Sequence, residues 1–437
     1  MTDASTLSPM SPGLLKVAER AKGYPGSRLL ALAHHLDEPA LVRAHGRLRR
    51  DAAVGVDGIT VEQYGQQLEE NVRALYQRMK AGKYRHQPIR RVHIPKEGSK
   101  TRPIGISTVE DKIVQGALRE VLEAVYEQDF LDCSYGFRPG RSAHDAIRTL
   151  NRELRPEAVS HLLEADIVSF FDSIDRQKLM EMLRDRIADE SLMRLVGKCL
   201  HVGVLDGGEY SEPDVGTAQG SVLSPLLGNV YLHHVLDLWF EKDVKPRLRG
   251  RAVLVRYADD FVILFQHGDD AVRVKKALEQ RMARHGLTLH PEKTRLVPFQ
   301  PPPGGTGKGT TTLDFLGFTM YWRKTRRGRW TVAFKTRRAS LRRAANAVAS
   351  WCRRHRHERV KDQHAMLRRK LTGHFNYFGV NGNTRCLEQL VWQVERTWKK
   401  WLGRRSQRGW ISWSRFKNLI KTYPLPRPTI RVQIWGT

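Results

Sequence analysis

The chain has 437 residues, with 75 Lys and Arg against 46 Asp and Glu, and a formal net charge of +29. This length suggests about two to four structural units, and the charge indicates a polyanionic partner. No run approaches the ~20 apolar residues of a membrane-spanning helix, and the N-terminus lacks the apolar segment of a secretory signal. The four scattered cysteines exclude a disulfide framework or Cys-x-x-Cys zinc module and fit a reducing cytosol.

The N-terminal part is expected to be helical and basic. Residues 14–22 and 28–47 carry apolar side chains at helical spacing, with basic residues between them. A loop rich in glycine follows, and Thr60 is expected to cap a helix over residues 61–80.

Residues 88–106 predict a β-hairpin with a Lys-Glu-Gly-Ser turn. This hairpin places Lys96 and Arg102 near one another. By themselves these two residues have the pattern of surface cations. Arg can also grip phosphate oxygens in a bidentate manner, and Lys supplies a point charge.

A loop with two arginines follows the helix predicted over residues 109–128. Its sequence is Ser134-Tyr-Gly-Phe-Arg-Pro-Gly-Arg-Ser142. Arg138 and Arg141 can contact phosphates, whereas Tyr135 and Phe137 fit a structural role as well as a binding role.

Three carboxylates are expected to converge. A strand ends near Asp166, and Asp175 is placed to cap a helix over residues 176–187. Residues 252–265 form two β-rich runs around Asp259 and Asp260, which predicts a tight hairpin with both acids at its tip.

Adjacent carboxylates repel and must be solvated, paired or bound to a cation. A hairpin tip exposed to water satisfies the first option. The flanking runs have the composition of strands buried on both faces, which favours a cation instead. Mg²⁺ prefers oxygen ligands, and two such ions about 3.5–4 Å apart can activate a hydroxyl and stabilise a leaving pyrophosphate.

The C-terminal third is expected to be a basic helical unit. Residues 338–356, 362–377 and 385–404 have helical patterns. Between residues 321 and 410 there are 25 Lys or Arg against 4 Asp or Glu. This surplus is mixed with tryptophan, which favours nucleic acid over a solvated helix face; the tryptophans are Trp322, Trp330, Trp351, Trp392, Trp398 and Trp401.

Several motifs together resemble reverse transcriptases encoded by bacterial group II introns, which also act as splicing maturases. Tyr257-Ala-Asp-Asp260 resembles their active-site signature, and Asp166 with Phe170-Phe171-Asp172 resembles their first metal-binding motif. Gln219-Gly-Ser-Val-Leu-Ser-Pro-Leu-Leu227 resembles the segment between these two. The resemblance extends from about residue 30 to residue 430. Within it, His374 stands where many members have Trp.

The resemblance implies an α+β fold of the right-hand polymerase type, with fingers, a palm built on an antiparallel sheet, and a helical thumb. The expected domains are an N-terminal extension (1–55), fingers (56–160), palm (161–322) and thumb or maturase domain (323–437). The group's Cys/His-rich endonuclease module has no counterpart in this sequence, so we expect an endonuclease-lacking type.

The resemblance also implies roles for individual residues. Phe171 is expected to be the steric gate that excludes a 2′-hydroxyl, a role that passes to Phe170 if the register differs by one. Lys293 either protonates the leaving pyrophosphate or is an ordinary exposed turn lysine. The expected catalytic residues and metal ligands are Asp166, Asp259 and Asp260, with Ile167 as a further metal ligand. The expected nucleotide-binding residues are Lys96, Arg102, Phe171, Gln219 and Lys293, and those contacting nucleic acid are Arg138, Arg141, Gly220, Leu316 and Gly317.

The implied cofactor is a pair of Mg²⁺ ions, with Mn²⁺ as an alternative. The implied partners are an intron RNA template, a DNA or RNA primer and dNTPs, with no membrane. The implied location is the bacterial cytoplasm, in association with the nucleoid, and a monomer and a dimer are both open. Two other hypotheses remain: a splicing-only RNA-binding protein with a vestigial polymerase site, and a domesticated reverse transcriptase serving DNA repair or phage defence.

Overall fold

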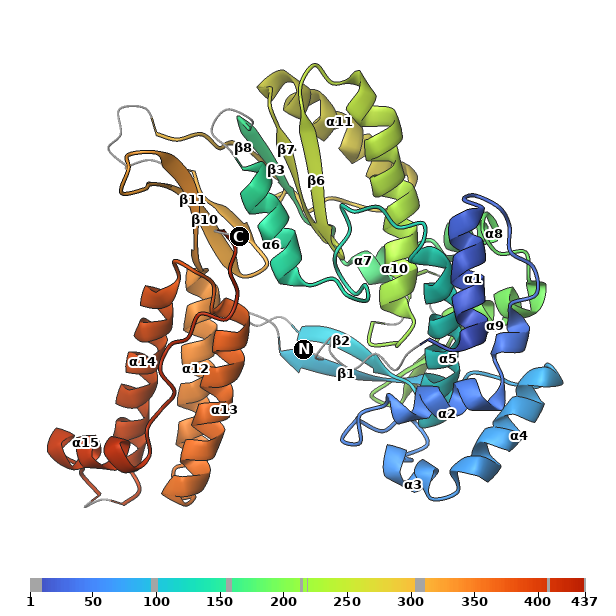
Figure 1. Cartoon of the computed structure of the whole chain (residues 1–437). Coiled ribbons are helices and arrows are strands. Elements are labelled where there is room, and N and C mark those ends of the chain that lie inside the picture. Colours follow the sequence, from blue (N-terminus) through green and yellow to red (C-terminus); the bar gives the residue numbers. More distant parts are fainter. Residues whose placement is uncertain are drawn as a thin grey trace. The chain divides into compact units, whose positions relative to one another are not determined.

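The computed structural model describes most of the chain, and it divides into two compact units (Figure 1). The described residues are 10–95, 101–154, 159–212, 215–217, 219–302, 311–406 and 409–435. The first unit comprises Met1–Ser142, Leu163–Ile263 and Asp269–Arg295, and the second comprises Ala143–Leu162, Leu264–Gly268 and Leu296–Thr437.

Side-chain caps begin the N-terminal helices. Asp37 caps α2 (Glu38–Gly46). Thr60 caps α3 (Val61–Gly65), as the sequence predicts, and forms a capping box with Gln63. The helix expected over residues 61–80 is interrupted, because Gln67 is non-helical (φ −124°, ψ 44°). The other helices of this region are α1 (Pro12–Gly23), η1 (Ala33–His35), α4 (Leu68–Lys80) and α5 (Val109–Tyr126), and both α1 and α2 pack against α5.

The first sheet confirms the predicted hairpin. Strands β1 (Ile89–Pro95) and β2 (Thr101–Ile106) pair antiparallel, with Arg102 opposite Ile94. Strand β4 (Val204–Asp206) adds parallel to β1, and β5 (Glu209–Ser211) pairs antiparallel with β4. Lys96, in the hairpin turn, lies outside the described residues.

A second four-stranded sheet has the order β6-β7-β3-β8. Its strands are β6 (Ala252–Tyr257), β7 (Asp260–Phe265), β3 (His161–Ala165) and β8 (Arg295–Pro298). The helices near it in the chain are α7 (Phe170–Ser173), α8 (Arg176–Arg184), α9 (Glu190–Leu200), α10 (Ser224–Leu232) and α11 (Gly268–Arg284). After α10 the helical path continues through two π-helical segments, η2 (His233–Asp237) and η3 (Trp239–Val244), and the short η4 (Lys245–Arg247). Asp175 caps α8, as predicted.

The second unit combines a small antiparallel sheet with helices. Its sheet has the order β11-β10-β9, with strands β9 (Leu313–Phe315), β10 (Phe318–Lys324) and β11 (Trp330–Thr336). Its helices are α6 (Ala143–Glu153), α12 (Arg338–Arg354), α13 (Val360–Phe378), α14 (Thr384–Leu402) and α15 (Trp413–Thr422). The basic helices expected from the sequence are therefore present.

Three of the six tryptophans that the composition associates with nucleic acid belong to the interior instead. Trp351 and Trp398 lie in the core of α12, α13 and α14, and Trp398 donates a hydrogen bond to Gln363 (2.8 Å). Trp322 is buried against Phe299. Burial of a large aromatic side chain removes much apolar surface from water, so these tryptophans stabilise the fold.

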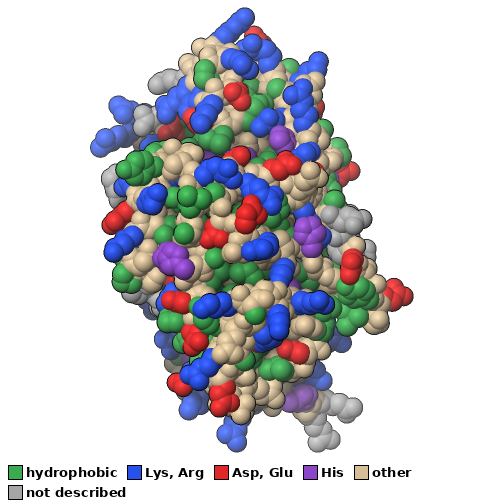
Figure 2. All heavy atoms as spheres, turned by 90° about the vertical axis from the view of Figure 1, so that its right-hand side faces the viewer, with side chains coloured by type: hydrophobic (Ala, Val, Ile, Leu, Met, Phe, Trp, Pro, Cys, Tyr) green, Lys and Arg blue, Asp and Glu red, His purple; other side chains and the backbone are tan. Residues whose placement is uncertain are grey.

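Basic residues are not spread evenly along the chain. On the face shown in Figure 2, basic, acidic and hydrophobic side chains are interspersed. Residues 321–410 contain 25 basic against 4 acidic residues, and this stretch includes β11, α12, α13, α14 and part of β10. In the described part of the chain, no helix combines the length and apolarity needed to cross a membrane.

The buried side chain of His233 should make the stability of the fold depend on pH. Its side chain is 4 % exposed, and its Nδ1 has no hydrogen-bond partner among the described residues. Burial lowers the pKa of His233 from 6.5 to about 3, and the nearby charges of His234 and Arg256 act in the same direction. Below pH 6.5 the unfolded chain therefore binds a proton that the folded chain does not.

The free energy of unfolding should consequently fall as the pH decreases from about 6.5, by about 1.4 kcal/mol per pH unit from this group alone. His233→Leu should remove that contribution, so the stability difference between wild type and variant changes with pH. Denaturant titrations between pH 4 and 8 measure it, with the exposed His357→Leu as control. Parallel stability curves for wild type and His233→Leu would contradict the prediction.

Candidate active site

The tip of the β6–β7 hairpin carries the acid pair. Ala258 adopts a left-handed backbone conformation (φ 57°), and Asp260 is the first residue of β7. The backbone of Gly136 approaches this turn so closely that a Cβ on residue 136 would lie 2.4 Å from the Ala258 nitrogen. The turn is therefore held from outside by the loop that contains Gly136.

Asp166 lies at the end of the strand next to β7. Strand β3 is the neighbour of β7, and Asp166 directly follows β3. Burial raises the pKa of Asp259, the charge of Asp166 raises it further, and the charges of Arg102 and Arg256 oppose the rise. Asp166 and Asp259 thus lie within electrostatic reach of one another, as the sequence predicts.

Lys293 lies beside this cluster. Its ammonium group forms an ion pair with the Asp166 carboxylate, and the Lys293 side chain is 56 % exposed. The backbone holds the segment in place, because His290 donates a hydrogen bond to the Asp166 carbonyl (2.8 Å) and Ile167 bridges to Leu289. Lys293 therefore supplies a local counter-charge, and its part in proton transfer stays a prediction.

The described residues contain no group of three or more His, Cys, Asp or Glu side chains arranged to hold a metal ion by themselves. The donor chemistry nevertheless suits Mg²⁺, which is commonly bound through one or two carboxylates plus substrate phosphates. Burial and the charge of Asp166 raise the pKa of Asp259, so a bound cation would favour the ionised form of this carboxyl.

Two aromatic residues follow Asp166 on α7. Phe170 is 3 % exposed, as expected for a core residue, whereas Phe171 is half-buried. Their ring centroids are 5.2 Å apart, and both rings approach Gly228 on α10. Phe171 thus keeps an accessible edge, and its role as a steric gate stays a prediction.

The Gln219–Gly220 turn is attached to the β1–β2 hairpin. Gly105 of β2 donates a backbone hydrogen bond to the Gln219 carbonyl (2.6 Å). Gly220 has φ 109°, and a Cβ there would lie 2.5 Å from the Gly105 carbonyl oxygen. Packing against Gly105 and the positive φ therefore require glycine at position 220, independently of any contact with nucleic acid. Arg102 on the same hairpin is exposed, and its charge influences Asp259 and Asp172.

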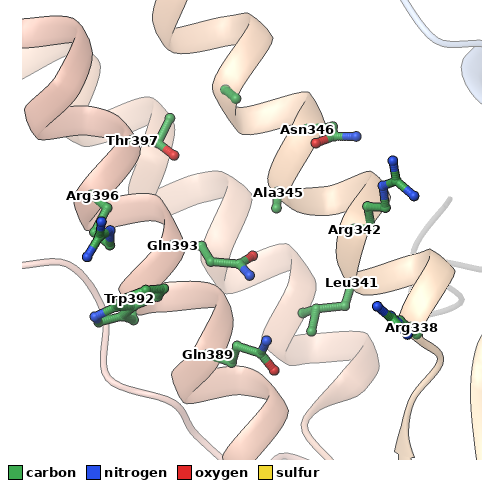
Figure 3. A pocket seen from close by; sticks show the side chains of 11 residues that line it. Arg338, Leu341, Arg342, Ala345, Asn346, Gln389, Trp392, Gln393, Arg396 and Thr397 are labelled. Atoms are coloured by element: carbon green, nitrogen blue, oxygen red, sulfur yellow. The ribbon is translucent and has the colours of Figure 1, made fainter.

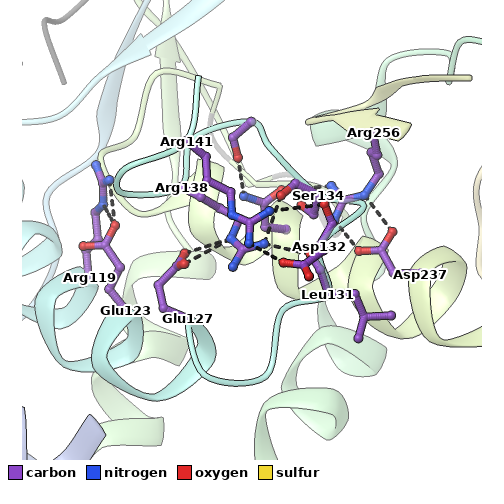
Figure 4. A network of polar contacts seen from close by, with 12 residues as sticks. Arg119, Glu123, Glu127, Leu131, Asp132, Ser134, Arg138, Arg141, Asp237 and Arg256 are labelled. Carbon is purple, nitrogen blue, oxygen red and sulfur yellow. Dashed lines mark hydrogen bonds and ion pairs between the residues drawn. The ribbon is translucent and has the colours of Figure 1, made fainter. Parts of the chain in front are cut away.

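Arg138, which the resemblance assigns to nucleic-acid contacts, has its guanidinium engaged inside the protein. Its guanidinium is buried, pairs with Glu127 (3.0 Å) and donates hydrogen bonds to the carbonyls of Leu131 (2.8 Å) and Ser134 (2.9 Å) (Figure 4). Because its hydrogen-bonding groups are occupied inside the protein, Arg138 orders its loop. Arg141 is partly exposed and pairs with Asp132, so it still has access to solvent.

Leu316 and Gly317 form the turn between β9 and β10, and both have positive φ (49° and 79°). Tyr377 donates a hydrogen bond to the Leu316 carbonyl (2.9 Å). These residues belong to the second unit, whereas the carboxylates belong to the first. Contact of this turn with a primer stays a prediction.

Sequence reasoning missed a buried ion pair that is hydrogen-bonded to the turn at Ala258. Arg256 and Asp237 are both fully buried, with 2.8 Å between Arg256 Nε and Asp237 Oδ1 (Figure 4). Arg256 Nη1 also donates to the Ala258 carbonyl (3.1 Å) and to Asn229 Oδ1 (2.9 Å). Asn229 in turn donates to the Gly136 carbonyl (2.7 Å), so one network ties the turn to the loop against it. An arginine inside the apolar strand run was the available signal.

The comparisons with known proteins agree with this geometry. A family model described as reverse transcriptase (RNA-dependent DNA polymerase) matches residues 94–320, a segment that includes Asp166, Asp259 and Asp260. The chain belongs to the reverse transcriptase family. The reverse transcriptase part of the resemblance found in the sequence is thereby confirmed, and the family description makes the chain an RNA-directed DNA polymerase.

Several curated proteins are similar over parts of their length. Protein YkfC of Escherichia coli K12 is 33% identical over 281 residues, 57% of this chain and 74% of YkfC. Group II intron-encoded protein LtrA of Lactococcus lactis subsp. cremoris is 40% identical over 187 residues, 41% of this chain but 31% of LtrA. Nuclear intron maturase 1 of Arabidopsis thaliana is 30% identical over 93 residues, 21% of this chain and 12% of that protein. This reverse transcriptase therefore has relatives of the group II intron type and spans under a third of LtrA.

The buried pair predicts separate effects on stability and activity. Arg256→Met leaves Asp237 buried without its partner and should destabilise the fold by about 3–5 kcal/mol. Arg256→Met combined with Asp237→Leu removes both charges and should recover much of that loss. Denaturant titrations measure the stability of each variant.

The double variant still lacks the hydrogen bond to the Ala258 carbonyl, so primer extension should stay impaired after stability is recovered. Full activity in a stable double variant would show that the ion pair serves folding alone.

Proposed function

We propose that this reverse transcriptase copies intron RNA into cDNA and also assists splicing of that RNA as a maturase. The observation that carries the proposal is the placement of Asp166 beside β7, where its charge perturbs Asp259. Nucleotidyl transfer needs clustered carboxylates of this kind. The names of the LtrA and intron maturase relatives support the intron as the source of the RNA.

Asp166, Asp259, Asp260 and the carbonyl of Ile167 are the groups that would hold two Mg²⁺ ions, with Mn²⁺ as an alternative. When bound, such ions supply positive charge that favours the 3′-alkoxide of the primer and the departing pyrophosphate. The hairpin turn is rigid, because the backbone of Gly136 packs closely against Ala258. A rigid turn keeps the carboxylates in position without reorganisation during the reaction.

The incoming dNTP would be held by the first unit. Arg102 acts electrostatically on Asp259, so it can hold phosphates close to the carboxylates, together with Lys96. Phe171 would lie under the sugar, and Gln219 would contact the nucleotide and template. Lys293, already beside Asp166, would donate a proton to the leaving pyrophosphate.

Template and primer would lie along basic surfaces, with Arg141 and Gly220 on the template side and Leu316–Gly317 at the primer. The basic residues of the second unit would neutralise further phosphates, and affinity should then fall steeply with salt. A cytoplasmic, nucleoid-associated location and a monomeric or dimeric state stay predictions.

A splicing-only protein with a vestigial polymerase site is the second candidate. The presence of Asp166, Asp259 and Asp260 beside Arg102 and Lys293 argues against loss of the chemistry. A domesticated enzyme for repair or phage defence would share the same site. Ribozyme structure in the flanking DNA supports the intron assignment, and its absence supports domestication.

Asp259→Ala should lower cDNA synthesis by at least about 100-fold, because it removes a group that acts on charge developing in the transition state. RNA affinity should stay nearly unchanged, since the basic surfaces are intact. Primer extension on an RNA template, with and without Mg²⁺, and filter binding measure the two properties. Asp269→Ala, at an exposed acid of α11, is the matched control. Retained synthesis in Asp259→Ala would refute the site.

Phe171→Ala should raise the incorporation of ribonucleotides relative to deoxyribonucleotides, because the space under the sugar becomes wide enough for a 2′-hydroxyl. Competition between NTPs and dNTPs in the same primer-extension reaction gives the ratio directly. An unchanged ratio would place the gate elsewhere.

A further inference from the structure

Helices α12 and α14 of the second unit enclose an open groove of about 470 Å³ (Figure 3). Its apolar lining comes from Leu341, Ala345 and Ala349 on α12. The remaining lining residues are polar, basic or aromatic: Arg338, Arg342, Asn346, Gln389, Trp392, Gln393, Arg396 and Thr397. No acidic residue lines it, so the groove favours an anionic occupant.

An aromatic ring stands at the edge of this groove. Trp392 is 54 % exposed, in contrast to Trp398, which lies further along the same helix and is buried. The guanidinium of Arg396 lies over the Trp392 ring, 4.6 Å from its centroid. A planar cation on an exposed indole forms a stacking platform on which a nucleobase can rest.

Amide groups lie beside the platform. In Figure 3 the side chains of Gln389 and Gln393 extend from α14 toward α12. The Oε1 atom of Gln393 is buried and has no hydrogen-bond partner among the described residues. A buried acceptor without a partner is costly, so rotation of the Gln393 amide toward a ligand in the groove would replace an unpaired oxygen with a hydrogen-bonded one. Amides offer donors and acceptors that match the edges of bases.

Two arginines lie on the opposite side of the groove. Arg338 and Arg342 occupy successive turns of α12, and both are exposed. Arg grips phosphate oxygens through several donors. The groove therefore combines a stacking surface, base-edge contacts and phosphate contacts within the second unit.

We propose that the α12–α14 groove binds one unpaired nucleotide of RNA. The base stacks on Trp392 and Arg396, its edge meets Gln389 and Gln393, and flanking phosphates pair with Arg338 and Arg342. Bases within a duplex already stack on their neighbours, so the groove selects single-stranded or bulged positions. This inference rests on the proposed function, since template or intron RNA supplies the nucleotide.

The test compares binding of a single-stranded RNA oligonucleotide with binding of the same sequence as a duplex. Trp392→Ala in the full chain should weaken single-stranded binding about 10-fold, in line with the loss of one base stack. Duplex affinity should stay unchanged, and Trp392→Phe should restore most of the loss. Trp410→Ala is the matched control, because Trp410 is 77 % exposed in the same unit and does not line the groove.

A second variant probes the base edge. Gln393→Leu should reduce discrimination among oligonucleotides that differ in one base and leave the salt dependence unchanged. Arg342→Gln should instead make the slope of log affinity against log salt concentration shallower by about 1, which corresponds to the loss of one phosphate contact.

If Trp392→Ala weakened single-stranded and duplex binding equally, the groove assignment would be overturned. If Trp392→Ala weakened neither, the assignment would also be overturned, and a protein partner would remain as the alternative occupant. Primer extension by the wild type separates the two proposals. A wild type that makes no cDNA contradicts the proposed function. A wild type that makes cDNA, with unchanged RNA binding in Trp392→Ala, contradicts only the groove.

Discussion

Mutual repulsion of carboxylates is the constraint that organises the first unit. Asp166, Asp259 and Asp260 meet at the ends of adjacent strands, and burial makes the charge of Asp259 still more costly. The chain compensates in part, through Lys293 at the surface and Arg256 in the interior. A divalent cation, together with the basic residues proposed to hold the dNTP phosphates, would supply the remaining positive charge.

The same cluster depends on a rigid turn, and much of the surrounding sequence serves that rigidity. Arg256 hydrogen-bonds the Ala258 carbonyl, and its charge is balanced by Asp237. Gly136 leaves room for the turn, and Arg138 orders the loop that presents Gly136. Motif residues that the resemblance assigns to nucleic acid therefore also act inside the protein. A preorganised turn stabilises developing charge without reorganisation during the reaction.

The second unit separates two uses of aromatic residues. Trp351 and Trp398 fill the core between helices, and Trp398 satisfies its indole N–H through Gln363. Trp392 projects outward under a guanidinium. A helix with one apolar stripe toward its neighbours and a basic opposite face can contribute to a stable core and to a phosphate-binding surface simultaneously.

The local features of the fold can be predicted from the sequence. The hairpin around Asp259, the caps at Thr60 and Asp175, and the basic helices follow from spacing and residue type along short stretches. The burial of Arg138, the pairing of Arg256 with Asp237 and the exposure of each tryptophan became visible in the folded chain alone. The groove likewise joins helices α12 and α14, which are separated in the chain by the whole of α13. Whether a side chain is buried, and which residue it pairs with, depend on which distant segments pack together. Periodicity within one segment carries no information about the segments that pack against it.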